Sequence, residues 1–124
     1  MEQPPRTSTS ALATITWSDA KVTIRFTGPA IGGREGPILR KEISPYLSIG
    51  TIHSVVLDLA KVTFMSDAGL EMLFTAFRAS TEIGFQLILY RLTPDIQTTL
   101  VRSGLDQVFT IVDSPDALAL LIGS

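Results

Sequence analysis

The stretch VVLDLAKVTFMSDAGLEMLF, residues 55–74, decides the fold. It opens with a short apolar run that ends at Asp58, passes through a brief connection, and then places Ser66 and Asp67 directly before residues with helical spacing. This order predicts a buried strand, a turn and a helix. Ser and Asp are both favoured N-cap residues, and a carboxylate at a helix start lies among unpaired N–H groups at the positive end of the helix dipole. The helix start is therefore a natural position for an anion and for a switch based on charge.

The composition limits the class of protein. A chain of 124 residues, 45% hydrophobic and 18% charged, is one domain able to bury a sizeable core. It has no cysteine, which excludes disulfides, thiolate metal sites and thiol nucleophiles and fits a reducing compartment. The net charge of −2 comes with no basic stripe, so we expect no nucleic-acid binding. The N-terminus lacks the apolar core of a signal peptide and no apolar run reaches membrane-spanning length, so we expect a cytoplasmic protein without membrane insertion.

The N-terminal third predicts a tail, a hairpin and a helix. Residues 1–10 are polar and rich in Pro, Ser and Thr, which indicates a disordered tail ahead of a domain spanning 11–124. Apolar and polar residues alternate over 13–17 and again over 22–27, with the turn-like Ser18-Asp19-Ala20 between them, so these are two strands of a hairpin. A glycine-containing loop follows, and helical spacing predicts a helix that starts between Arg34 and Pro37 and runs to Leu47.

The remaining elements complete the fold class. The apolar run at 54–59 is best placed in the middle of a sheet that helices cover on both faces. The helix from Asp67 to Thr81 follows, then a strand at 85–89, a helix capped by Thr93-Pro94, a strand at 109–112 and a last helix after Ser114-Pro115. This order predicts a single α/β domain with a mixed central sheet and about four helices.

The helix beginning at Asp67 carries two kinds of apolar residue. Large ones, Leu70, Leu73, Phe74 and Phe77, are predicted to form the stripe that faces the core. Ala68, Met72, Ala76 and Ala79 fall toward the opposite flank, beside polar residues. This flank is either an ordinary surface or a patch on which a partner docks, with Met72 as its adaptable centre, and the spacing alone favours neither interpretation.

Sites for catalysis or for a cofactor are not predicted. His53 has no second ligand at a useful spacing and is best interpreted as a residue at a strand edge. The loop Gly28-Pro29-Ala30-Ile31-Gly32-Gly33 resembles part of a phosphate-binding loop but lacks its Lys-Ser/Thr ending, so a plain loop is favoured. With one His, no Cys and no paired carboxylates in a plausible cleft, we expect neither an enzyme nor a bound metal or cofactor.

Two separated motifs give the chain a resemblance to a known family. The segment DLAKVTFM-SDAGL, residues 58–70, and the segment RSGLD, residues 102–106, with Phe109, Ile111 and Ala117-Leu118 after it, resemble a STAS domain over nearly the whole chain, residues 13–122. STAS domains occur in bacterial anti-sigma factor antagonists and in sulfate transporter tails. The short chain favours the antagonist type. The resemblance implies a cytoplasmic bacterial protein that binds an anti-sigma factor of the GHKL serine-kinase type, through a surface formed by Ser66, Asp67, Ala68, Gly69, Met72 and Ala76.

The sequence departs from the family motif at its phosphorylation site. In the antagonists the motif is typically Asp-Ser-Ser/Thr/Ala-Gly, and the partner kinase phosphorylates the Ser directly after the Asp. Here Ser66 stands at the family's Asp, and Asp67 stands at the phosphoacceptor. Asp67 has no hydroxyl group, but it places one negative charge where phosphorylation would place about two. The acidic residue that the family carries soon after the second strand is also replaced, by Gly28-Pro29-Ala30.

Three interpretations of this position remain open. Asp67 either stabilises the helix start as a cap, by about 1 kcal/mol, or acts as a permanent surrogate for the phosphorylated state, and the two roles are compatible. In the third, the neighbouring Ser66 accepts phosphate instead, although its register differs by one residue from the position that a kinase would address.

Two further functions stand beside the anti-sigma antagonist. The chain could be a STAS subunit of a lipid-transport ABC system or part of a stress-sensing assembly, which co-purification with an ATPase or transport subunit would select. The sequence leaves open the identity of the partner and whether the chain forms a homo-oligomer.

Overall fold

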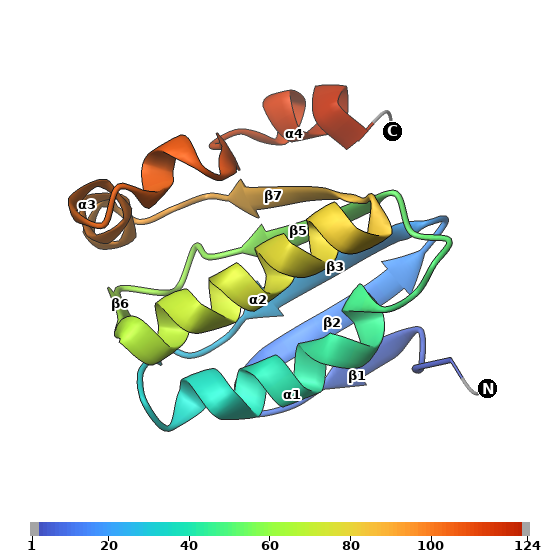
Figure 1. The fold of residues 1–124 in the computed structure, drawn as a ribbon, viewed down its shortest axis with the longest axis horizontal. Coiled ribbons are helices and arrows are strands. Elements are labelled where there is room, and N and C mark those ends of the chain that lie inside the picture. The colour runs from blue at the N-terminus through green and yellow to red at the C-terminus, as the bar shows by residue number, and fades with distance from the viewer. Residues whose placement is uncertain (1–2, 123–124) are drawn as a thin grey trace.

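The central sheet is mixed, as the sequence predicts. A computed structural model describes residues 3–122 and places six strands in the order β1-β2-β3-β5-β7-β8 (Figure 1). The first three pair antiparallel, whereas β3, β5, β7 and β8 run parallel to one another. Their bounds are Thr7–Thr9 (β1), Ala13–Ser18 (β2), Lys21–Phe26 (β3), Ser54–Asp58 (β5), Gln86–Tyr90 (β7) and Thr110–Val112 (β8).

Helices cover both faces of this sheet. α1 (Glu35–Leu47) and α2 (Asp67–Ile83) lie side by side across one face (Figure 1). α4 (Pro115–Ile122) packs its Leu118 and Ile122 on a small cluster formed by Val56, Ile88 and Tyr90, whose side chains alternate with those facing α1 and α2. α3 (Pro94–Arg102) and a short 3-10 helix, η1 (Leu105–Gln107), connect β7 to β8. The predicted α/β domain with four helices is confirmed.

Local signals in the sequence explain several element boundaries. Asp19 and Ala20 both have positive φ angles, 52° and 66°, which is the backbone that a two-residue hairpin turn requires between β2 and β3. The Thr93 hydroxyl accepts a hydrogen bond from the Ile96 N–H, so the predicted cap of α3 is formed. Gly84 ends α2 in the left-handed conformation, as a C-terminal glycine does.

The predicted disordered tail over residues 1–10 is wrong for Thr7–Thr9, which form β1 and pair with Thr14–Thr16. Two further contacts hold this segment. The Arg6 guanidinium lies 4.0 Å from the centre of the Trp17 ring, and the Tyr46 hydroxyl donates a hydrogen bond to the Pro5 carbonyl. The polar composition misled the prediction because an edge strand needs backbone partners more than apolar side chains. Residues 1–2 of the tail and 123–124 of the domain lie outside the described residues.

Candidate functional site

The start of α2 was singled out by the sequence, and it is formed as predicted. Ser66 occupies the N-cap with extended backbone, and Asp67 is the first helical residue. The carbonyl of Ser66 accepts the first helical hydrogen bond, from the Leu70 N–H at 3.0 Å. Neither side chain makes a capping hydrogen bond. Asp67 is exposed, so its carboxylate acts on the helix through its charge rather than through a cap.

A small second sheet holds this helix start in place. β4 (Ala30–Ile31) and β6 (Phe64–Met65) pair in parallel, and the Ser66 N–H donates to the Ile31 carbonyl at 3.0 Å. The N-terminal end of α2 therefore lies close to the β4 backbone, directly after β6 (Figure 1). This two-residue pairing was not predicted, because segments so short carry no periodic pattern in the sequence.

Glycines permit two close approaches at the site. A Cβ atom on Gly69 would lie 2.6 Å from the Ile31 carbonyl oxygen and 2.4 Å from Cγ of Met65. A Cβ atom on Gly36 of α1 would lie 2.8 Å from the Ala68 carbonyl oxygen. Both helices thus approach their neighbours more closely than any larger residue allows, which fixes the position of Asp67.

The prediction that Met72 and Ala76 form an exposed partner surface is wrong. Both side chains are fully buried, and Gly69 is buried as well. The face of α2 that packs on the sheet and on α1 is lined with small or flexible residues because those neighbours come close. Ser66 and Ala68 are half-buried, so Asp67 is the one predicted contact residue that is exposed.

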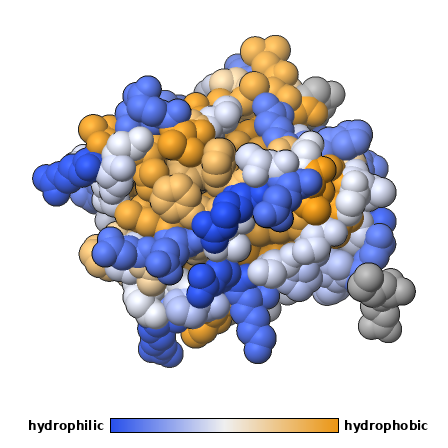
Figure 2. Space-filling view, in the orientation of Figure 1, coloured by the Kyte–Doolittle hydropathy of each residue, from blue (hydrophilic) through white to orange (hydrophobic). Residues whose placement is uncertain are grey.

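Of the four large apolar residues predicted to face the core, Leu73 is fully buried as predicted, whereas the other three lie at the margin of the core. Leu70, Phe74 and Phe77 are half-buried, and both phenylalanine rings contact Phe109, with centroids 6.3 and 5.7 Å apart. Figure 2 shows hydrophobic side chains gathered over this part of the surface, between α2 and α3. Val101 in α3 is also a large apolar residue that is exposed, at 61%.

Sequence reasoning also missed Phe64. This residue of β6 is 55% exposed and stands two positions before the N-cap of α2. The exposure of Phe64 indicates a contact surface, because large aromatic side chains that face solvent are typical of such surfaces. In the sequence, Phe64 lies in the connection between the predicted strand that ends at Asp58 and the helix that starts at Asp67, and nothing in this connection indicates that its ring is exposed.

Asp58, at the end of β5, is a buried charge with several partners. Its side chain is 3% exposed and forms an ion pair with Arg91, while Arg25 lies 3.6 Å away. The hydrogen bond from Arg91 to Asp58 raises the pKa of the guanidinium, which keeps its charge. The Thr93 hydroxyl donates to the Val62 carbonyl at 2.6 Å. Together these contacts join the connection after β5, which leads to Asp67, to the segment after β7.

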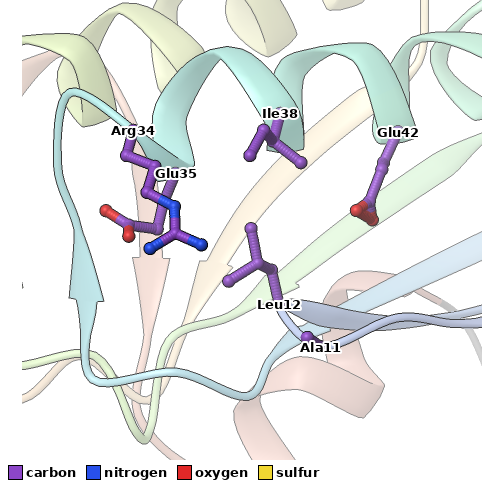
Figure 3. Close-up of a pocket in the computed structure, with 6 residues that line it drawn as sticks. All are labelled: Ala11, Leu12, Arg34, Glu35, Ile38 and Glu42. Atoms are coloured by element: carbon purple, nitrogen blue, oxygen red, sulfur yellow. The ribbon is translucent and has the colours of Figure 1, made fainter.

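One cleft outside the start of α2 is lined by charged side chains. This cleft of about 300 Å³ lies between α1 and the turn before β2, where Leu12 and Ile38 point toward each other (Figure 3). Its carboxylates already accept hydrogen bonds: Glu35 from the Gly32 N–H and Glu42 from the Ser10 hydroxyl. Within residues 3–122 no three metal-binding side chains gather.

His53 is exposed just before β5, at the strand edge where the sequence places it. Over the same part of the chain, no helix has the length and hydrophobicity needed to cross a bilayer.

Comparison with known proteins gives a family and a shared fold. The model of the STAS domain family matches residues 14–118. An anti-sigma factor antagonist from Mycobacterium paratuberculosis superposes with a TM-score of 0.72 at 21% identity, over 99% of this chain and 100% of that one. A STAS domain protein from Planctomyces limnophilus, described as an anti-sigma-factor antagonist, has a TM-score of 0.80 at 16% identity, covering 91% and 98% of the two chains. The phosphorylated form of the Bacillus cell fate determinant SpoIIAA has a TM-score of 0.70 at 18% identity, covering 90% and 99%. At these identities the structural matches show the fold alone.

Proposed function

The chain belongs to the STAS domain family, and from that premise we propose that it is a non-catalytic binding module of the anti-sigma factor antagonist type. Its partner in this proposal is an anti-sigma factor of the GHKL serine-kinase type in the bacterial cytoplasm. The observation that carries the proposal is the exposed carboxylate of Asp67 at the first position of α2, the position that corresponds to the phosphoacceptor in the family motif.

The proposed contact surface is centred on Asp67 and differs from the one that the sequence suggested. Ser66 and Ala68 flank the carboxylate, and Phe64 offers an exposed aromatic anchor beside it. Aromatic side chains, phenylalanine included, are enriched at protein interfaces relative to the rest of the surface. Gly69, Met72 and Ala76 contribute indirectly, because their close packing holds the helix in position.

In this proposal Asp67 acts as a permanent surrogate for a phosphorylated serine. A carboxylate supplies about one negative charge against about two for a phosphate, so it reproduces part of the repulsion toward an acidic or apolar partner surface. Two like charges 4 Å apart repel by about 1 kcal/mol in water and by about 4 kcal/mol at a protein surface with an effective dielectric of 20. This range of repulsion corresponds to a weakening of partner binding by about fivefold to about 1000-fold.

The test measures binding of the full chain to each kinase-type anti-sigma factor encoded in the same genome, by isothermal titration calorimetry. Asp67→Asn and Asp67→Ser should each raise the affinity about tenfold, because the repelling charge is removed. Asp95→Asn is the matched control, since Asp95 is also an exposed acidic residue in the first turn of a helix. It should leave the affinity unchanged.

Phosphorylation gives an independent readout. After incubation with the bound kinase and ATP, Asp67→Ser should gain the mass of one phosphoryl group, whereas the wild type should not. Equal affinities for the wild type and both Asp67 variants would exclude the surrogate role. Absence of binding to every anti-sigma factor tested would exclude the antagonist function itself.

A further inference from the structure

Two arginines lie on the face of the sheet opposite α1 and α2, one in β3 and one directly after β7. In the strand register, Arg25 of β3 lies between Thr14 of β2 and Asp58 of β5. Arg91 follows directly after Tyr90, which is the partner of Asp58 on β7. The side chains of Arg25 and Arg91 are 57% and 43% exposed, whereas that of Asp58 is 3% exposed. The carboxylate is therefore covered, and the two guanidinium groups face solvent.

Both carboxylate oxygens of Asp58 already accept hydrogen bonds without Arg25. Oδ1 of Asp58 accepts hydrogen bonds from the Ala60 N–H at 3.1 Å and from Nε of Arg91 at 3.3 Å. Oδ2 accepts a short bond from Nη2 of Arg91. Nε of Arg25 lies 3.6 Å from Oδ2, which is beyond a hydrogen bond. Arg25 thus adds a second positive charge that the buried carboxylate does not need for its hydrogen bonds.

The local charge and the free donors favour an anion. Within residues 3–122, Asp58 is the one carboxylate that lies within 4.0 Å of either guanidinium, so the group of three side chains carries a net charge of +1. In the same part of the chain, Arg25 donates no side-chain hydrogen bond, and Nη1 of Arg91 donates none either. A guanidinium has five N–H donors in a planar fork that matches the oxygens of phosphate.

Arg91 is also held in one place. Two hydrogen bonds fix it to Asp58, and its guanidinium carbon lies 5.0 Å from the centre of the Tyr90 ring. A donor that is fixed before binding loses little conformational freedom when a ligand arrives. The half-buried Thr14, the direct neighbour of Arg25 across the strand pair, places a hydroxyl group beside the same area.

We propose that Arg25 and Arg91 form a subsite for a tetrahedral oxyanion with two negative charges, namely inorganic phosphate or a phosphate monoester. Arg25 contributes its free donors, and Arg91 contributes Nη1 from a fixed position. The subsite lies on the face of the sheet opposite α1 and α2, so it is separate from the Asp67 surface, and its occupation requires no partner protein.

The experiment is a titration of the full, 15N-labelled chain with sodium phosphate at pH 7.5, at an ionic strength held constant with sodium chloride, followed by NMR. The amide signal of Ala60 and the Nε–H signals of both arginines should shift in a saturable way. Phosphoserine added in place of phosphate should shift the same signals, which would identify phosphate monoesters as ligands. In a third titration, sodium acetate should bind with at least about tenfold lower affinity than phosphate. Acetate carries one negative charge and two oxygens fewer than the phosphate dianion.

Variants assign the binding to the two arginines. Arg25→Gln should lower the phosphate affinity about tenfold through loss of charge-assisted hydrogen bonds. Its fold is preserved because Asp58 keeps Arg91, which thermal unfolding can verify. Arg40→Gln is the matched control, since Arg40 is an exposed arginine of α1 far from Asp58 in the fold, and it should bind phosphate like the wild type.

Three results would overturn the proposal. These are the absence of saturable shifts, equal phosphate affinity for Arg25→Gln and the wild type, and acetate binding as tight as phosphate binding.

Discussion

Replacement of Gly69 by alanine tests whether close packing fixes the start of α2. The new Cβ atom would lie 2.6 Å from the Ile31 carbonyl oxygen, which is a backbone atom and also accepts the Ser66 N–H. The contact with Cγ of Met65 at 2.4 Å can relax through side-chain rotation, but the carbonyl cannot move without shifting β4. Overpacking of this kind costs about 1–3 kcal/mol, and the better helix propensity of alanine returns up to about 1 kcal/mol.

We therefore expect Gly69→Ala to lower the free energy of unfolding by about 1–2 kcal/mol. For a domain of this size, that change lowers Tm by about 3–10 °C. Urea denaturation and calorimetry of the wild type and the variant would measure both quantities. The matched control is Gly33→Ala, because a Cβ atom at Gly33 meets nothing within 4 Å and its backbone lies outside the left-handed region. The control should be neutral or slightly more stable. If Gly69→Ala is as stable as the wild type, the helix start is not held against β4 and the site is looser than we infer.

Three further substitutions test the charges and the exposed aromatic ring. Asp58→Asn removes the charge that accepts two hydrogen bonds from the half-exposed Arg91 and should lower the free energy of unfolding by about 1–3 kcal/mol in urea denaturation. Asp67→Asn should cost about 0.3–1 kcal/mol, measured the same way, and this loss should shrink at high salt because the charge is exposed. Phe64→Ala should change stability by less than about 0.5 kcal/mol. It should nevertheless weaken calorimetrically measured binding to the anti-sigma factor about tenfold, whereas equal affinity would remove Phe64 from the proposed surface.

The elements with strong local signals could be predicted from the sequence. Thr93-Pro94 and Ser114-Pro115 each mark a helix start, and the alternation on either side of Asp19 marks a hairpin. These signals are local because capping and tight turns depend on a few neighbouring residues. The mixed sheet followed from their order along the chain.

The faces of α2 could not be predicted in the same way. Hydrophobicity ranks Phe74 and Phe77 above Ala76, yet Ala76 is fully buried and both phenylalanines are half-buried. Burial here depends on the distance between α2 and its neighbours, because a helix that lies close to the sheet and to α1 has room for Gly69 and Ala76 at the closest approaches and for a larger side chain such as Leu73 elsewhere. That distance is a property of the tertiary structure.

Contacts between distant short segments were also beyond the sequence. β4 and β6 are two residues each, and their pairing is visible only when the chain is folded. The same holds for the site itself. The sequence predicts that Asp67 stands at a helix start. The exposure of Phe64 and the approach of Arg25 and Arg91 to Asp58 depend on the tertiary structure.

Both outer strands of the six-stranded sheet, β1 and β8, are only three residues long. A short edge offers few free backbone groups to a strand from another molecule, and β1 is composed of Thr and Ser residues that interact well with water. The fold therefore disfavours edge-to-edge pairing of strands from two molecules, which is a common route of aggregation for β-rich proteins. The helix start that we propose as the contact surface would therefore meet a partner through side chains rather than through exposed backbone.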